Sequence, residues 1–163
     1  MNRRKLITAA GAAMVAAAAP TAAVADGGDD QDLVGSYYGT ITATDPPLGQ
    51  FNNVITFHQG GVVVESRRYY VPFTPLGPLL ETSGHGAWKR NRRGTYDAFF
   101  RFLLQQAPPS AGEPLGTDNI RLSLRVHRGT GNLIGTFESN IKGLDGAIIF
   151  TAKGDFSAER ITV

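Results

Sequence analysis

The chain contains no cysteine, and this absence removes several kinds of chemistry from consideration. Without thiols there is no disulfide, no thiolate metal ligand and no cysteine nucleophile. A Gly-x-Ser-x-Gly nucleophile motif, a close carboxylate pair of the glycosidase type and a glycine-rich loop leading into a helix are also missing. Burial must therefore hold the fold together, and no motif identifies a catalytic centre.

Histidines are few as well, and the sequence keeps them apart. The three are His58, His85 and His127. A metal site would need them to converge, but the strand pattern described below directs His85 and His127 outward. It also places His85 at the opposite end of the fold from the other two. No His-x-His or His-Glu pair is present. We therefore predict no metal site and no cofactor.

The chain also lacks an apolar run long enough to span a bilayer, which takes about 20 residues. Its first 25 residues instead have the three parts of a secretory signal: a basic start at 3–5, an alanine-rich run at 9–19, and Ala23-Val24-Ala25 before a cut. Paired arginines favour the twin-arginine route over the general secretory route. We therefore predict a secreted, extracellular protein with no stable membrane span. It would comprise a signal peptide at 1–25, an acidic flexible leader at 26–32 and one domain at 33–163.

A marked excess of charge of one sign is missing too. The chain has 16 basic and 14 acidic residues, a formal net charge of +2. The predicted signal holds three of the basic residues and no acidic one, which leaves 13 basic against 14 acidic residues. A nearly neutral domain lacks the electrostatic footprint of a nucleic-acid binder, so we predict no nucleic acid as a partner.

What the sequence has in abundance is short segments rich in Val, Ile, Phe, Tyr and Thr, separated by Gly, Pro and Asn. The clearest segment is 120–127, where every second residue from Ile120 to Val126 is apolar and the residues between them are polar. Such alternation is typical of a strand with one buried face. The pattern predicts eight strands, at 34–42, 53–58, 62–70, 84–89, 95–105, 120–127, 133–139 and 147–156.

The connections between these strands alternate in length. Those after the second, fourth and sixth strands have three to five residues, whereas 44–51, 71–83 and 106–119 are longer and contain prolines. In an up-and-down sheet the two sets lie at opposite ends. Closing eight strands into a barrel removes exposed edges and leaves room for side chains or one small ligand. We therefore predict an all-β fold, an eight-stranded antiparallel up-and-down barrel with a closed end and a mouth. A two-sheet sandwich is the alternative.

Alternation also predicts which side chains face the interior. On 95–105, solvent-facing Asp97 and Arg101 send Phe100 and Phe102 inward. On 84–89, the same logic sends Trp88 inward. Because Trp88 comes late on its strand, we expect it low in the barrel, where a large apolar side chain can plug the core.

The strand at 62–70 contains the most informative polar side chains. We place Glu65 and Arg67 outward, since charged residues are mostly exposed. That choice sends Arg68 and Tyr70 inward near the mouth. A few polar groups in an apolar pocket are typical of small-ligand sites, so these two residues are predicted to meet the polar end of a ligand. The alternative is an arginine whose stem packs while its head reaches solvent.

Two short segments and one late arginine support a family resemblance. Gly35-Ser36-Tyr37 opens the first strand, Gly86-Ala87-Trp88 lies on the fourth, and Arg160 is near the C-terminus. With the strand layout of 33–163, they resemble the calycin superfamily of lipocalin-like barrels, in which a Gly-x-Trp on the first strand seals the closed end beneath a late arginine. Tyrosine replaces that tryptophan here, so the likeness is to the architecture.

Two further resemblances bear on whether the protein is an enzyme. The segment 84–96 looks like one found in small secreted bacterial proteins of unassigned function, which implies the fold and no activity. Allene oxide cyclase and dirigent proteins also use eight-stranded barrels, and they are the comparison on the enzyme side.

The leading hypothesis is a secreted barrel that binds a small hydrophobic or amphipathic molecule in its interior, with Trp88 as a structural plug. The predicted ligand-binding residues are Arg68, Tyr70, Phe100, Phe102, Leu122, Leu124, Phe137 and Phe150. One alternative is a barrel-type cyclase or isomerase for a hydrophobic substrate, which shapes its substrate in a dry pocket and has no catalytic residue assigned. Another is a non-catalytic surface-interaction protein.

The surface-interaction alternative rests on one basic turn. It holds four cations within five residues, namely Lys89, Arg90, Arg92 and Arg93. Such a cluster can make weak contact with an anionic surface. A solvated hairpin turn is the simpler interpretation.

Overall fold

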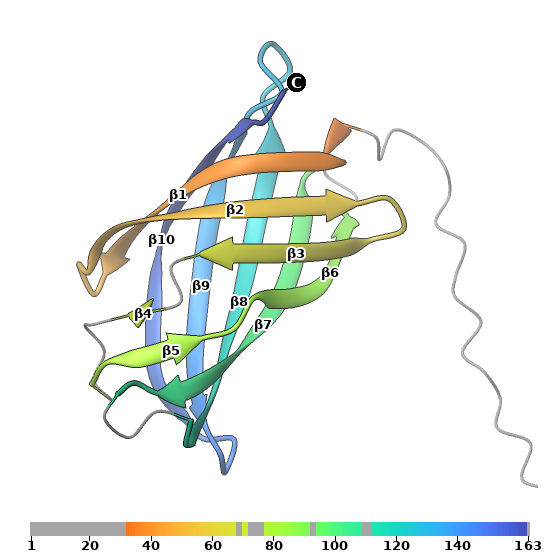
Figure 1. Ribbon diagram of the computed structural model, residues 1–163. Helices are drawn as coiled ribbons and strands as arrows, with labels where there is room; N and C mark the ends of the chain where they lie inside the picture. The colour runs from red at the N-terminus through yellow and green to blue at the C-terminus, as the bar shows by residue number, and fades with distance from the viewer. Residues whose placement is uncertain (1–31, 68–69, 72–76, 92–93, 109–111, 163) are drawn as a thin grey trace, which may run out of the picture.

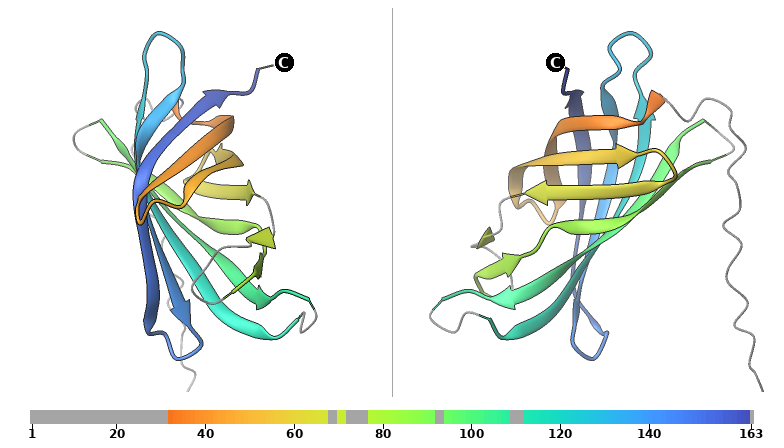
Figure 2. Two further views of the ribbon diagram at one scale, coloured as in Figure 1. Left: turned by 90° about the vertical axis from the view of Figure 1, so that its left-hand side faces the viewer. Right: turned by 45° about the vertical axis from the view of Figure 1, so that its right-hand side comes forward.

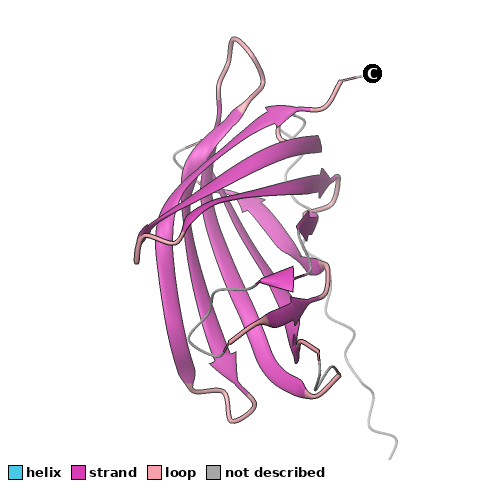
Figure 3. Cartoon of the chain, turned by 60° about the vertical axis from the view of Figure 1, so that its left-hand side comes forward, coloured by secondary structure: helices cyan, strands magenta, loops and turns pink. Residues whose placement is uncertain are grey.

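The computed structural model describes residues 32–67, 70–71, 77–91, 94–108 and 112–162. The predicted signal and all of the predicted leader except Asp32 lie outside these residues. The described chain consists of strands and connecting loops (Figures 1 and 3). The ten strands are β1 (Gly35–Asp45), β2 (Gly49–His58), β3 (Val62–Arg67), β4 (Tyr70–Val71), β5 (Leu79–Glu81), β6 (Gly84–Arg90), β7 (Tyr96–Gln106), β8 (Pro114–Val126), β9 (Leu133–Gly143) and β10 (Ile148–Arg160).

Eight of these strands form a closed antiparallel barrel. Their order is β7-β6-β3-β2-β1-β10-β9-β8, and β8 pairs with β7 to close the ring (Figure 1). Neighbours around the ring are thus neighbours in sequence, apart from the two short strands β4 and β5. The all-β, up-and-down, eight-stranded barrel predicted from the sequence is confirmed, and the sandwich alternative is wrong.

The two short strands belong to the wall of the barrel. β5 pairs with β7 just beyond the end of β6, and β4 pairs with β5. The sequence prediction of a loop over 71–83 is therefore wrong in part. Leu79 and Glu81 alternate with Leu80 as in any half-buried strand, but a strand of three residues is too short for a pattern to stand out.

The connections gather at two ends of the barrel. Figure 2 shows the turn between β8 and β9 at the same end as the C-terminus, and the turn between β9 and β10 at the opposite end. We call the first the closed end and the second the mouth. Two of the predicted long loops are shorter than expected. Only residues 46–48 separate β1 from β2, and β8 already begins at Pro114. Pairing of Gly116 with Gly143 of β9 extends β8 into the predicted loop.

The closed end is sealed by the side chains that the family resemblance pointed to. The Arg160 guanidinium lies over the Tyr37 ring, 5.2 Å from its centroid, and donates to the Tyr37 hydroxyl at 2.7 Å and to the Val34 carbonyl at 3.2 Å. Tyr37 in turn donates to the Leu33 carbonyl at 2.9 Å. Burial raises the pKa of the Tyr37 hydroxyl. The contact ties the first strand of the barrel to the last.

Candidate functional site

The interior of the barrel is divided into three layers from the mouth to the closed end. The layer at the mouth is a small apolar cluster of Leu79, Leu104 and Ile141, with Leu115 and Phe150 packed against it. The layer at the closed end is the main hydrophobic core, which includes Tyr37, Phe57, Trp88, Tyr96, Phe100 and Leu124. Between them lie buried polar side chains, namely Asn53, Glu65, Arg67, Glu81, Asp118 and Ser139. We call these six residues the polar layer.

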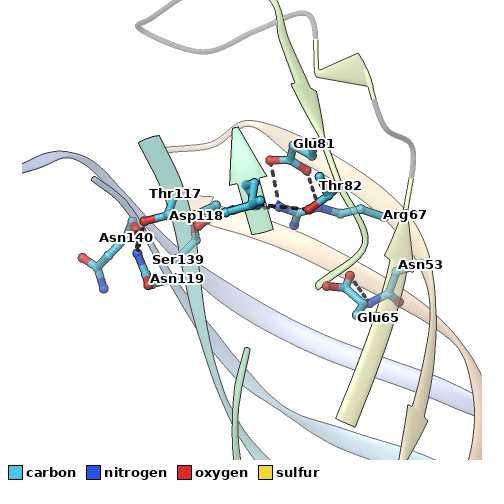
Figure 4. A network of polar contacts seen from close by, with 11 residues as sticks. Asn53, Glu65, Arg67, Glu81, Thr82, Thr117, Asp118, Asn119, Ser139 and Asn140 are labelled. Atoms are coloured by element: carbon cyan, nitrogen blue, oxygen red, sulfur yellow. Dashed lines mark hydrogen bonds and ion pairs between the residues drawn. The ribbon is translucent and has the colours of Figure 1, made fainter. Parts of the chain in front are cut away.

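Arg67 is at the centre of the polar layer, and its side chain is only 14% exposed. Its guanidinium donates to both carboxylate oxygens of Glu81, from Nε at 2.7 Å and from Nη2 at 3.0 Å. Nη2 also donates to Asp118 Oδ2 at 2.7 Å (Figure 4). Below the guanidinium lies the ring of Phe102, with 4.3 Å from Cζ to its centroid. Acidic side chains from β5 and β8 thus contact one cation from β3.

Local sequence explains why these side chains fit inside. Phe102 and Asp118 are paired opposite each other on β7 and β8, and both point inward. Gly84 makes room for the Phe102 ring, because a Cβ at this position would lie 2.7 Å from it. Ser139 of β9 donates to Asp118 Oδ1 at 2.6 Å, so both oxygens of this carboxylate accept hydrogen bonds.

Glu65 and Asn53 form the second part of the polar layer. Glu65 is 0% exposed and Asn53 is 3% exposed. Asn53 Nδ2 donates to Glu65 Oε1 at 2.7 Å. The other oxygen of each side chain, Asn53 Oδ1 and Glu65 Oε2, is buried without a hydrogen-bond partner. Unpartnered buried acceptors are rare and costly, and they mark a place where a donor is missing.

The electrostatics of the layer follow from burial and from an excess of carboxylates. Burial raises the pKa of Glu65 to about 7, although Arg67 and the Asn53 hydrogen bond oppose the rise. Burial also raises the pKa of Glu81 despite its contact with Arg67. Burial lowers the pKa of the Arg67 guanidinium, but Glu81, Glu65 and Asp118 outweigh it and the net change is upward. Arg67 is therefore always charged, and Glu65 exchanges its proton near neutral pH.

This arrangement supplies three chemical capabilities within one apolar enclosure. Arg67 is a fixed positive charge, Glu65 is a carboxyl group that titrates near pH 7, and two oxygens are open to a donor. Convergent polar groups of this kind, set in apolar walls, are typical of sites that orient a small molecule.

The sequence-based choice of inward residues on β3 is wrong. Glu65 and Arg67 face the interior, whereas Val62 and Ser66 are exposed. The rule that charged side chains face solvent fails because these charges pair inside with Glu81 and Asn53. The prediction for Arg68 lies outside the described residues, and Tyr70 is described only as part of β4.

The predicted apolar site residues all lie on the inner face or at its rim. Phe100, Phe102 and Leu124 have zero exposure, so no space of the size of a water molecule lies against them. Leu122 and Phe137 are also buried, and Phe150 is half-buried at the mouth. Trp88 lies in the core near the closed end, with edge-to-face contacts to Phe57 and Tyr96 and its ring N–H donating to the His58 carbonyl at 3.0 Å.

Several polar residues considered from the sequence lie on the surface. His58, His85 and His127 are exposed. His85 pairs with Val64, next to Glu65, but its side chain is on the outer face of the barrel. Lys89 and Arg90 of the basic turn are exposed as well, and Arg92 and Arg93 lie outside the described residues. In the described part of the chain, no group of three or more His, Asp or Glu side chains is placed to hold a metal ion.

A groove of 1060 Å³ lies along β6–β10, and its lining is mostly outward side chains but also includes Trp88, Leu122 and Phe137. It is lined by charges of both signs in cross-strand rows, including Lys89, Asp97, Arg121, Glu138 and Lys153. Phe99 is 40% exposed there, beneath the Arg121 guanidinium. Because the charges alternate and solvent reaches them freely, the groove has no preference for a ligand of either sign.

Sequence reasoning missed Glu81, Asp118 and Ser139, although one signal was available. Asp118 continues the inward series of Ile120, Leu122 and Leu124, so extending the alternation of β8 by two residues places this carboxylate inside. Ser139 was within a predicted strand and carried no signal of its own. Glu81 was in the predicted loop.

Comparison with known proteins adds no family to this description. No protein-family model, no curated protein and no solved structure matches the chain. The closed eight-stranded antiparallel barrel is consistent with the calycin superfamily, but the architecture is not specific to it. Among the described residues, no helix is both long and apolar enough to cross a membrane.

Proposed function

We propose that the protein binds a small amphipathic molecule in its barrel, with the polar end of the ligand held by the polar layer. The observation that carries this proposal is the buried charged cluster of Arg67, Glu81 and Asp118 between two apolar layers. Desolvating three charged groups is costly, and an apolar set of the same volume usually serves stability as well or better. A function in ligand recognition explains why charges occupy this position.

The site also explains where a ligand would enter. The polar layer is one layer below the mouth, beneath Leu79, Leu104 and Ile141. β5 carries Leu79 and is held to β7 by only three residue pairs, so it is the shortest fully described part of the wall. A ligand entering from the mouth would part these apolar side chains and place its own apolar body among them. Its polar end would then reach Arg67 and its neighbours.

Export and superfamily membership are part of the same proposal. The signal-like first 25 residues favour a secreted protein, and the Tyr37–Arg160 contact favours a calycin relationship. An exported barrel that carries a small molecule fits both. Neither point depends on the identity of the ligand.

The test is calorimetric titration of short-chain amphiphiles and polycyclic apolar compounds into the purified protein and two variants. Arg67→Met with Asp118→Asn removes the central ion pair, and Arg125→Met removes an exposed arginine from the same barrel as a control. We expect the double variant to lose at least tenfold in affinity and the control to bind normally. Equal affinities in all three proteins, or no binding of any compound to the native protein, would contradict the proposal.

A second candidate function is an enzyme of the barrel cyclase or isomerase kind, and Glu65 is the observation in its favour. A buried carboxyl with a pKa of about 7 is suited to proton transfer at neutral pH, because a catalytic group works best near its own pKa. Arg67 would stabilise negative charge that develops on the substrate.

One variant distinguishes the binding function from the enzyme function. Glu65→Gln keeps the shape of the side chain and removes its ability to exchange a proton. If the protein is an enzyme, Glu65→Gln abolishes turnover of a bound compound while binding persists. Mass spectrometry of the products measures the turnover. If the protein is only a binder, no bound compound is converted by either form. The exposed Glu159→Gln change is the matched control.

A further inference from the structure

Hydrogen bonding in the polar layer is incomplete, because two buried acceptors have no donor. Asn53 Nδ2 is used on Glu65 Oε1, and Ser139 Oγ is used on Asp118 Oδ1. Arg67 directs Nε and Nη2 to Glu81 and Asp118. The two atoms left unsatisfied, Asn53 Oδ1 and Glu65 Oε2, are both acceptors. Each of these two oxygens therefore calls for a hydrogen-bond donor.

The charges of the layer are unbalanced in the same direction. Three carboxyl groups, those of Glu65, Glu81 and Asp118, share the single guanidinium of Arg67. These are also the ionisable groups that act on Glu65 from β3, β5 and β8. With all three carboxyls ionised, the layer carries a net negative charge inside an apolar enclosure. A second cation would neutralise it in part, whereas an anion would add to the repulsion.

We infer that the polar end of the ligand is a protonated primary amine, which donates to Glu65 Oε2 and Asn53 Oδ1. An ammonium group has three donors and no acceptor, so its chemistry matches two orphan acceptors, and it supplies the missing positive charge. This inference rests on the proposed binding function and specifies the class of ligand. A carboxylate or phosphate head does not fit, because it brings further acceptors to a place where donors are missing.

Protons compete with such a ligand for Glu65. In the empty barrel at low pH, a proton on the Glu65 carboxyl relieves the charge imbalance, and binding of the amine must displace it. The amine itself stays protonated across the neutral range, since alkylamines have a pKa near that of lysine. Affinity for an amine therefore rises as the pH passes upward through the pKa of Glu65, by about tenfold between pH 6 and pH 8.

The experiment uses three probes with the same apolar chain, octylamine, 1-octanol and octanoate, titrated calorimetrically into the purified protein at pH 6 and pH 8. We expect octylamine to bind at least tenfold more tightly than either of the others at pH 8. We also expect its affinity alone to increase with pH. In Glu65→Gln the pH dependence of octylamine binding should disappear, and in the exposed control Glu159→Gln it should persist.

Each failure of this experiment has a distinct meaning. Octanoate or octanol binding as tightly as octylamine would overturn the inference and leave the proposed binding function standing. An octylamine affinity that does not change between pH 6 and pH 8 in the native protein would also overturn it, whether or not the variant folds. If none of the three probes binds, while other amphiphiles in the wider panel do, the amine inference fails alone. If nothing in that panel binds, the proposed function fails with it.

Discussion

At the scale of single residues, the protein is defined by a few charged groups in a place where apolar ones are expected. Arg67 is stabilised by two carboxylates and by the Phe102 ring, and Glu65 pairs with one amide. These groups are buried together because each satisfies part of another. Removing Arg67 leaves its two carboxylates desolvated and without a cation, which costs more than the pairs contribute.

Glu65 makes the stability of the protein depend on pH. Its pKa rises from 4.5 in the unfolded chain to about 7 in the folded protein, so the folded state holds the proton more tightly. The resulting stabilisation is fully present below pH 4.5 and is lost as the pH rises through 7. The raised pKa of Glu81 acts in the same direction. We expect the free energy of unfolding to fall by roughly 2 kcal/mol between pH 5 and pH 8.

Urea unfolding at several pH values measures this effect. Glu65→Gln should remove most of the decline and should be more stable than the native protein at pH 8, whereas Glu159→Gln should follow the native curve. A free energy of unfolding that rises over this range in the native protein would show that Glu65 is ionised and favourably paired.

Arg67 is expected to be among the residues most sensitive to substitution. Arg67→Met leaves Glu81 and Asp118 without their cation in a buried layer, which should lower the free energy of unfolding by about 3–5 kcal/mol. The exposed Arg125→Met change should alter it by less than about 0.5 kcal/mol. Equal effects in chemical denaturation would mean that solvent screens the Arg67 ion pairs.

At the scale of the strand, close contacts between neighbours decide what fits inside. β6 must approach β7 closely at Gly84, where the Phe102 ring fills the place of a side chain. Because Phe102 supports Arg67, a glycine on one strand positions a cation from another. The polar layer thus depends on glycines that contribute no polar group.

Substitution of Gly84 by alanine tests this dependence. A Cβ there would lie 2.7 Å from the Phe102 ring, and the crowding should cost about 1–3 kcal/mol of unfolding free energy. Gly129→Ala, whose Cβ would make an ordinary contact at 3.5 Å, is the matched control and should be nearly neutral. Thermal unfolding of the two variants side by side measures the difference. A neutral Gly84→Ala would mean that Phe102 can move away without loss.

The strand scale is also where prediction from sequence was strong and then failed. The alternation of β8 and the aromatic row of β7 identified the inner face of both strands correctly. On β3, the run Val62-Val63-Val64 has no alternation between apolar and polar residues. The prediction of which side chains face inward therefore rested on the charged residues alone, and it was wrong. A rule based on solvation of single side chains cannot anticipate a charge that pairs with residues 14 and 51 positions away.

At the scale of the whole molecule, the barrel is a closed ring whose terminal strands meet. Strand number, order and the two ends followed from the spacing of apolar segments and turns, because an up-and-down barrel needs only local connections. The layering of the interior did not, since it depends on which residues from five different strands share one level. The sequence alone does not show that these residues lie at the same level of the barrel.

Closure of the ring is expected to depend on Arg160. Arg160→Met keeps the apolar stem and removes the contacts with the Tyr37 ring, its hydroxyl and the Val34 carbonyl. We expect a loss of about 2 kcal/mol in unfolding free energy. Arg128→Met in the exposed neighbouring turn is the control and should have little effect. Faster hydrogen exchange in β1 and β10 should accompany the loss, and unchanged exchange there would contradict this role.

A crystal structure of the protein with octylamine shows whether the polar layer is a ligand site. We expect a nitrogen atom within hydrogen-bond distance of Glu65 Oε2 and Asn53 Oδ1, with the octyl chain directed toward Leu79 and Leu104 at the mouth. Octylamine bound only in the outer groove of β6–β10, with the polar layer unchanged, would contradict it.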